Sequence, residues 1–93
     1  MKPVIVTTEH KGVFFGYIPE KAKTNKASIV LKKARMCVYW SSDVRGVIGL
    51  GKTGPSKNCK IGPACDSITL FDLTAVMDAT PEAVKAWENA PWN

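Results

Sequence analysis

Long apolar runs are missing from this sequence. The longest uninterrupted ones, such as MCVYW (36–40) and GVIGLG (46–51), are far shorter than the roughly 20 residues that a membrane-spanning helix needs. The N-terminal stretch MKPVIVTTEHKG also lacks the apolar region and the small-residue cleavage site of a secretion signal. We therefore expect no transmembrane helix, no membrane partner and a cytoplasmic location.

Residues that bind metals or act as nucleophiles are also scarce. The chain has a single histidine, His10, and three cysteines, Cys37, Cys59 and Cys65, an odd number that favours free thiols in a reducing compartment. The five residues between Cys59 and Cys65 do not match the short ligand spacing of structural zinc sites. Nothing in the sequence pairs a cysteine with the histidine as a nucleophile and its base. We expect no catalytic residue, no metal, no cofactor and no enzymatic activity.

The composition is that of a folded domain. Hydrophobic residues make up 45% of the chain and charged residues 23%, which is ordinary for a globular protein and unlike a disordered one. A chain of 93 residues builds one core at most. We therefore expect a single domain over residues 1–93.

Short β-prone segments separated by turn residues fill most of the sequence, and a helical period follows them near the C-terminus. Segments rich in Val, Ile, Thr and aromatic residues predict strands at 4–10, 12–18, 27–33, 34–40 and 59–62, and one strand or a pair broken by a bulge at 67–78. Thr80 suits a helix N-cap, Pro81 the first helical position, and Pro91 a stop. The predicted fold is mainly β: a small bent antiparallel sheet or an SH3/Sm-like barrel of five or six strands with a short C-terminal helix.

The same patterns predict which side chains form the core. Alternation in ARMCVYW (34–40) places Met36, Val38 and Trp40 on one face, which we expect to be buried, and leaves Arg35, Cys37 and Tyr39 on the other. In the C-terminal helix, Ala83, Val84 and Trp87 share one face, which we expect to pack against the sheet.

Residues 46–53, GVIGLGKT, match the spacing of the phosphate-binding P-loop of nucleotide hydrolases. That motif requires a strand before it, a long helix after it and a parallel sheet, because the helix N-terminus and backbone N–H groups hold the phosphates. Here Gly54 and Pro55 follow directly, and a chain this short has no room for repeated strand–helix–strand units. We expect a glycine-rich, cationic loop over 44–54 with at most one helical turn.

Charge is distributed unevenly along the chain. Residues 1–60 hold twelve Lys and Arg side chains against three acids, a net charge of +9, whereas residues 61–93 hold one Lys against five acids, a net charge of −4. A basic region of this kind is typical of a surface that meets phosphate or an acidic partner. Alternatively, the two regions neutralise each other in the folded chain.

The predicted binding face combines basic strand residues with cations of the 45–60 segment. It consists of Lys32, Lys33, Arg35, Tyr39, Arg45, Lys52, Lys57 and Lys60. Nucleic-acid-binding barrels join a cationic groove to aromatic side chains on which bases stack. Aromatic residues of a small β domain are more often core, however, so this pattern leaves both protein and nucleic-acid partners open.

Two segments carry a resemblance to known families. GVFFG (12–16) and ARMCVYW (34–40) resemble a family of small uncharacterised proteins of tailed phages and prophages, and the likeness extends over the whole chain. It implies a phage accessory protein inside a host cell and assigns no activity to any residue. GVFFGYI followed by ASIVLKKA also resembles the first motif of Sm-like RNA-binding barrels, although the second motif is missing. This likeness implies a barrel and leaves ring assembly open.

Three functions remain after these exclusions. The first is a non-enzymatic phage-type protein that binds a host macromolecule and inhibits a host enzyme or defence complex. The second is a nucleic-acid-binding β-barrel, which predicts affinity that falls steeply with salt. The third is a virion or assembly component that forms homo-oligomers through unpaired strand edges and Trp92.

Overall fold

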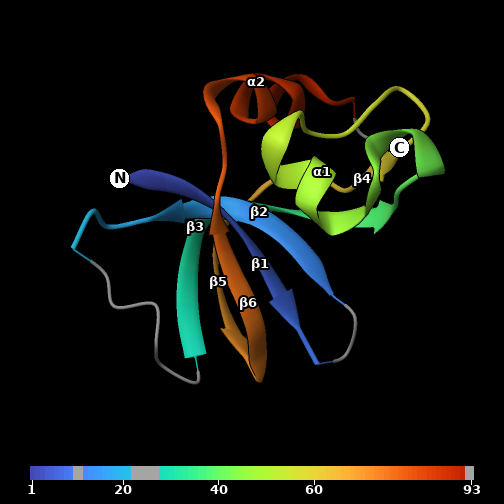
Figure 1. Cartoon of the computed structure of the whole chain (residues 1–93). Helices are drawn as coiled ribbons and strands as arrows, with labels where there is room; N and C mark the ends of the chain where they lie inside the picture. Colours follow the sequence, from blue (N-terminus) through green and yellow to red (C-terminus); the bar gives the residue numbers. More distant parts are fainter. Residues whose placement is uncertain (10–11, 22–27, 92–93) are drawn as a thin grey trace.

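The computed structural model describes residues 1–9, 12–21 and 28–91, and it confirms the mainly β fold with a C-terminal helix (Figure 1). The strands are β1 (Lys2–Thr8), β2 (Val13–Ile18), β3 (Ser28–Tyr39), β4 (Lys60–Ile61), β5 (Cys65–Phe71) and β6 (Leu73–Asp78). The helices are a 3₁₀ turn η1 (Ser42–Val44), α1 (Gly46–Lys52) and α2 (Pro81–Asn89). The ends at 10 and 27 of two predicted strands, and Trp92 of the assembly hypothesis, lie outside the described residues.

All strand pairs are antiparallel, and the sheet is strongly bent. β1, β2 and β3 form a meander, β5 pairs with β3, and β6 pairs with β1. Asp72 alone separates β5 from β6, and its left-handed backbone, with a φ of 56°, redirects the chain between the two partners. The sheet therefore curls back on itself, which gives it an inner face and an outer face. Of the two predictions for 67–78, the broken pair is confirmed.

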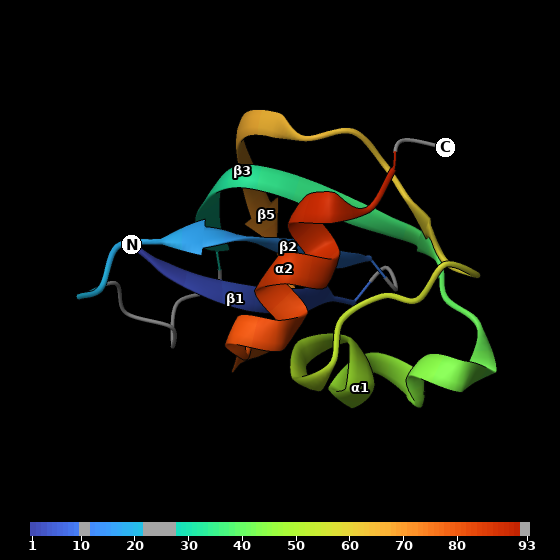
Figure 2. The same cartoon turned by 90° about the horizontal axis from the view of Figure 1, so that it is seen from above.

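Each face of the sheet buries its own core. The inner-face core joins side chains from all five longer strands: Val4, Val6, Ile18, Ile29, Leu31, Ala34 and Leu70, with Phe14, Ile68, Leu73 and Val76 packed against it. The outer-face core lies between the sheet and the helices: Ile5, Val13, Phe15, Cys37, Val44, Leu50, Cys59, Ile61, Ala83 and Trp87. Figure 2 shows α2 lying across β1 and β2, with α1 beside it. Side chains alternate along β1, so Val4 and Val6 lie in the inner-face core and Ile5 lies in the outer-face core.

Strand β3 changes faces at Lys33. Leu31 and Cys37 are an even number of residues apart, which in a regular strand would put them on one face. Lys33 adopts a left-handed conformation with a φ of 51°, and the pairing with β2 shifts register between Phe15 and Tyr17. As a result, Leu31 belongs to the inner-face core and Cys37 to the outer-face core. The two strands predicted at 27–33 and 34–40 are one strand with this irregularity.

The core prediction for 34–40 is therefore wrong. Met36 and Val38 are 42% and 61% exposed, whereas Arg35 and Cys37 are buried. Met36 and Val38 follow Ala34, the last residue of β3 that pairs with β5, so no strand covers the sheet there on that side. Trp40 is half-buried and packs against the edge of the outer-face core.

Helix α2 is confirmed, together with its predicted cap and buried face. The Thr80 hydroxyl accepts a hydrogen bond from the Ala83 N–H at 3.1 Å, and Pro81 occupies the first turn. The Trp87 ring stacks on Phe15 with centroids 5.3 Å apart, and its indole N–H donates to the Leu50 carbonyl at 3.0 Å. This one side chain therefore ties α2 both to the sheet and to α1.

The prediction of a mostly irregular 44–54 segment is wrong, because the residues that resemble a P-loop form α1 themselves. Two glycines explain how they can. A Cβ on Gly49 would lie 1.5 Å from the Val44 carbonyl oxygen, and one on Gly51 would lie 2.9 Å from the Met77 Sδ. The glycines therefore let a short helix pack tightly on η1 and on β6. The strand–loop–helix arrangement of a P-loop is not formed by these residues.

Candidate functional site

Arg35, one of the predicted binding residues, is not on the surface. It is 9% exposed, and its guanidinium donates to the carbonyls of Gly62, Trp87 and Ala90, each at 2.8 Å. Two of these carbonyls belong to the C-terminal end of α2, where the helix dipole favours a cation. Placing Arg35 on a binding face is therefore wrong: its charge fastens α2 and the segment after β4 to the sheet.

The seven other predicted residues are exposed, but they do not form one continuous group. Arg45 and Lys52 lie at the two ends of α1. Lys32 and Lys33 line a cavity of about 360 Å³ together with Tyr17 and Glu88. Tyr39 pairs with Lys60 across β3 and β4, and Lys57 lies in the loop before β4. The sequence shows that all seven side chains are polar or amphipathic and does not show which of them lie together.

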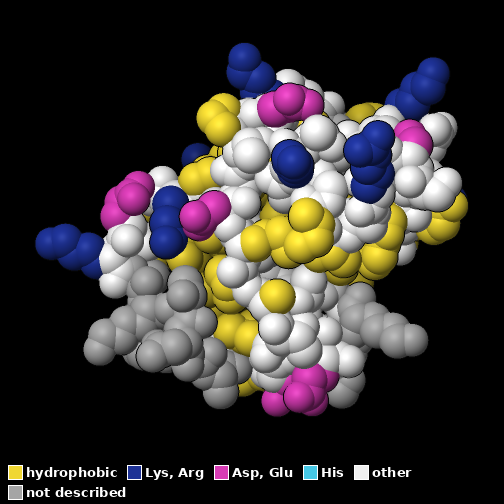
Figure 3. Space-filling model, in the orientation of Figure 1, with side chains coloured by type: hydrophobic (Ala, Val, Ile, Leu, Met, Phe, Trp, Pro, Cys, Tyr) yellow, Lys and Arg dark blue, Asp and Glu magenta, His cyan; other side chains and the backbone are white. Residues whose placement is uncertain are grey.

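The most apolar hollow lies beside α1 and is called the α1 groove here. It has a volume of about 400 Å³. Its lining consists of Thr7, Gly12, Val13, Trp40, Val47, Ile48, Ala75 and Met77. Its floor is the part of the outer sheet face that the helices leave uncovered, and α1 forms one wall. Figure 3 shows hydrophobic side chains gathered on this side of the molecule below α1.

Ile48 is the most exposed large apolar side chain among the described residues, at 70%. Gly51 brings α1 so close to the sheet that Leu50 is fully buried, and Ile48 therefore faces solvent above the groove. The exposure of Ile48 follows from its position on a helix. Because the sequence predicted no helix over 46–52, it could not predict whether Ile48 is buried or exposed.

Two cations stand at the ends of α1, the helix that forms one wall of the groove. Arg45 is its N-cap, with a left-handed backbone, and Lys52 is its last residue. Within residues 1–9, 12–21 and 28–91, the one ion pair joins the N-terminal ammonium to Glu20 at 3.6 Å. Arg45 and Lys52 are thus without a carboxylate partner in this part of the chain. The apolar groove therefore lies against a helix that has a cation at each end.

A second apolar cavity opens at the end of the inner face. It has a volume of about 440 Å³, and Phe71, which is 64% exposed, and Met36 stand at its rim. Its lining also includes the polar side chains of Thr8, Thr69 and Asp72. This cavity is therefore less uniformly apolar than the α1 groove, where Thr7 has the one polar side chain among the described lining residues.

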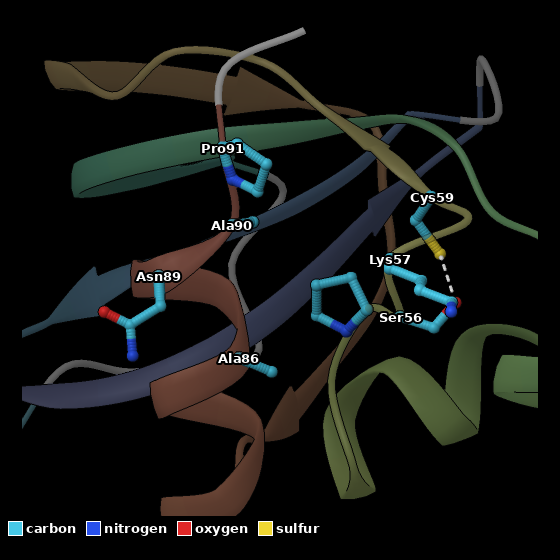
Figure 4. A pocket seen from close by; sticks show the side chains of 8 residues that line it. Ser56, Lys57, Cys59, Ala86, Asn89, Ala90 and Pro91 are labelled. Carbon is cyan, nitrogen blue, oxygen red and sulfur yellow. Dashed lines mark hydrogen bonds between the residues drawn. The ribbon is translucent and has the colours of Figure 1, made fainter.

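A smaller cavity of about 190 Å³ separates α2 from the loop before β4 (Figure 4). In Figure 4 the Cys59 thiol points toward Ser56, with Sγ 3.8 Å from the serine hydroxyl oxygen, while Ala86 and Asn89 of α2 stand opposite. Burial and the nearby Cys59 raise the pKa of Cys37 to about 11, so that this thiol stays protonated at neutral pH. A protonated, buried thiol is a poor nucleophile, so Cys37 is not an activated cysteine.

The cavity beside Lys32 and Lys33 contains a phenol–carboxylate contact. The Tyr17 hydroxyl donates to the Glu88 carboxylate, and burial followed by this contact raises the pKa of Tyr17 to about 12. The phenol therefore remains neutral and serves to join β2 to α2. Glu88 also adds a negative charge to a cavity that the two lysines would otherwise make cationic.

The described residues form no metal site and no membrane-spanning helix. No group of three or more His, Cys, Asp or Glu side chains among the described residues is placed to hold a metal ion. No helix within the described ranges is long and apolar enough to cross a lipid bilayer. The groove beside α1 is therefore the place where the described surface offers most to a ligand.

Comparison with known proteins gives a family and no activity. The profile of a family described as "Domain of unknown function (DUF6948)" matches residues 1–87. The chain therefore belongs to this family. No curated protein and no solved structure matches it.

Proposed function

We propose that this member of the DUF6948 family is a binding module without catalytic activity, and that it attaches to another protein through the α1 groove. The observation that carries the proposal is an exposed isoleucine, Ile48, standing at the most uniformly apolar of the hollows described above, which has a volume of about 400 Å³. Exposed apolar patches with polar rims mark interaction sites, because burying them on a partner removes apolar surface from water.

The biological setting of the proposal comes from the resemblance of GVFFG (12–16) and ARMCVYW (34–40) to small proteins of tailed phages. On that basis the partner is a protein of the host cell, and the binding module acts in its cytoplasm, where occupying a surface of an enzyme or defence complex is enough to inhibit it. The net positive charge of residues 1–60 supports a partner with an acidic surface. Opposite charges increase the rate at which two proteins associate and favour one relative orientation.

The proposal is tested by photocrosslinking in cells that naturally contain the protein. A photoreactive amino acid is placed at position 48 and, as a control, at position 85, an exposed site on α2. We expect one protein to be crosslinked from position 48 and not from position 85. After identification and purification, that protein should bind the unmodified chain, and Ile48→Asp should weaken the complex at least tenfold. Equal crosslinking from both positions, or unchanged affinity in Ile48→Asp, would refute the assignment.

A second candidate function rests on the pair formed by Tyr39 and Lys60. Tyr39 is 55% exposed and lies opposite Lys60 across β3 and β4, which sets a stacking surface beside a cation. Single-stranded RNA or DNA bound there would lose affinity steeply as salt rises. Electrophoretic mobility at low and physiological salt tests this, with Tyr39→Ala as the variant that should abolish the shift. No shift at low salt would end this alternative.

The third candidate function is assembly of the chain into homo-oligomers. Among the described residues β5 pairs with β3 alone, so its other edge is available to a further strand. Light scattering at several concentrations distinguishes a monomer from a closed ring. A ring larger than a dimer would favour an assembly role over the binding module.

A further inference from the structure

We infer that the α1 groove takes an acidic amphipathic segment of a partner protein, an inference that rests on the function proposed above and names the chemistry of its occupant. The groove offers two kinds of contact in one place: an apolar floor and a pair of cations. An occupant that matches both must carry apolar side chains on the face that enters the groove and carboxylates beside them.

The floor requires the apolar part of the occupant. Val13 and Met77 come from the sheet, Trp40 follows β3, and Val47 comes from α1, and none of the described residues that line the hollow is charged. A polar segment placed here would lose its hydration without gaining a hydrogen-bonding partner. A nucleic-acid backbone would set phosphates over the same apolar surface, so the groove favours a peptide with large aliphatic or aromatic side chains.

The cations at the ends of α1 favour an occupant that also carries acidic side chains. Arg45 caps the N-terminus of α1 and Lys52 ends it, so the two cations stand at opposite ends of a seven-residue helix, which is about 10 Å long. Carboxylates at the same separation occur at i and i+7 of a partner helix, or three residues apart in an extended segment. Since neither cation has a carboxylate partner within the described ranges, pairing with the occupant breaks no existing ion pair there. A basic segment would be repelled from the same wall.

Selection from random peptides tests this inference without knowing the partner. Peptides of about 14 residues, which span about 21 Å as helices, are displayed and selected on the purified full chain. Selection on Ile48→Asp in parallel identifies the peptides that depend on the groove. We expect groove-dependent peptides to combine Leu, Ile, Phe or Trp with two or more Asp or Glu.

Charge-neutral variants then test the cations directly. The affinity of the selected peptides should fall about 3- to 10-fold in Arg45→Gln/Lys52→Gln, since each exposed ion pair contributes modestly. It should not change in Lys21→Gln/Lys85→Gln, which removes the same total charge from other exposed positions. The difference between the two variants should shrink as salt is raised.

The outcomes separate the two proposals. Groove-dependent peptides with no preference for acids, or with equal affinity for both double variants, would overturn the acidic occupant and leave the binding function standing. An absence of groove-dependent peptides would overturn both. A dimer of the free chain that Ile48→Asp dissociates would assign the groove to a second copy and also overturn the inference.

Discussion

The inner and outer faces of the bent sheet are closed in different ways. The inner face is closed by the strands themselves, and every buried residue of its core is aliphatic. The outer face is closed by two short helices, and its core includes Phe15, Trp87 and the thiols of Cys37 and Cys59, with the guanidinium of Arg35 buried beside it. The inner face depends on sheet pairing, whereas the outer face depends on a few specific contacts.

This difference explains where the apolar surface is left over. The strands β5 and β6 cover the inner face except beyond Ala34, where Met36 stays exposed, while α1 and α2, of seven and nine residues, are too short to extend over the whole outer face. The uncovered strip of the outer face becomes the floor of the α1 groove. The helical layer thus both completes the core and exposes a surface for binding.

Removing Trp87 should have the largest effect on the outer face. The side chain is fully buried, stacks on Phe15 and donates to the Leu50 carbonyl. Trp87→Ala should lower the free energy of unfolding by about 3 to 5 kcal/mol, measured by urea denaturation. A loss below about 1 kcal/mol would show that the helices are held by other contacts.

Arg35 tests whether a buried charge holds the helical layer. Arg35→Met removes three hydrogen bonds to carbonyls and should cost about 3 kcal/mol of unfolding free energy, because the acceptors lose their donor. Arg35→Lys keeps the charge without the planar fork and should recover only part of this loss. If Arg35→Met unfolds at the same urea concentration as the wild type, this account of α2 is wrong.

The thiol of Cys37 makes the outer face sensitive to alkaline pH. In the unfolded chain a thiol ionises near its ordinary pKa of 9.0, whereas burial and Cys59 raise the folded-state pKa of Cys37 to about 11. The folded state therefore holds a proton that the unfolded state releases, and stability present below pH 9 is lost as pH rises toward 11, by about 1.4 kcal/mol for each pKa unit. Unfolding at pH 8, 9, 10 and 11 should show a shallower decline for Cys37→Ala; identical slopes would contradict this reasoning.

Ile48 should have the smallest effect on stability. Because 70% of its surface is exposed, Ile48→Asp should change the free energy of unfolding by less than about 0.5 kcal/mol. The matched change Leu31→Asp, in the fully buried inner-face core, should prevent folding or unfold the protein in far less urea. A large stability loss in Ile48→Asp would mean that this side chain supports the fold instead of a binding surface.

Local patterns in the sequence were sufficient for much of the fold. The β-prone segments and the Thr80 cap depend on neighbours within a few positions, and the structure confirms the strands within the described ranges and the cap. The faces of β3 were not predictable in this way. A left-handed Lys33 reverses the alternation, and lysine gives no local sign of such a conformation.

The candidate site was less predictable for a related reason. Arg35 was assigned to the surface because alternation put it opposite the predicted core face of 34–40, and its true partners lie 27 and more residues away in the sequence. The glycines of GVIGLGKT indicated a loop, whereas their role is to let α1 approach η1 and β6. Arg45 and Lys52 were predicted, but Ile48 between them was not, because its exposure follows from that helix.

The affinity of the crosslinked partner for two aspartate variants tests the central claim most directly. Ile48→Asp alters the α1 groove on the outer face, and Phe71→Asp alters the rim of the inner-face cavity at a similarly exposed site. We predict that Ile48→Asp weakens binding at least tenfold and that Phe71→Asp leaves it unchanged. Loss of binding in Phe71→Asp with full affinity in Ile48→Asp would contradict the account and place the binding surface on the inner face.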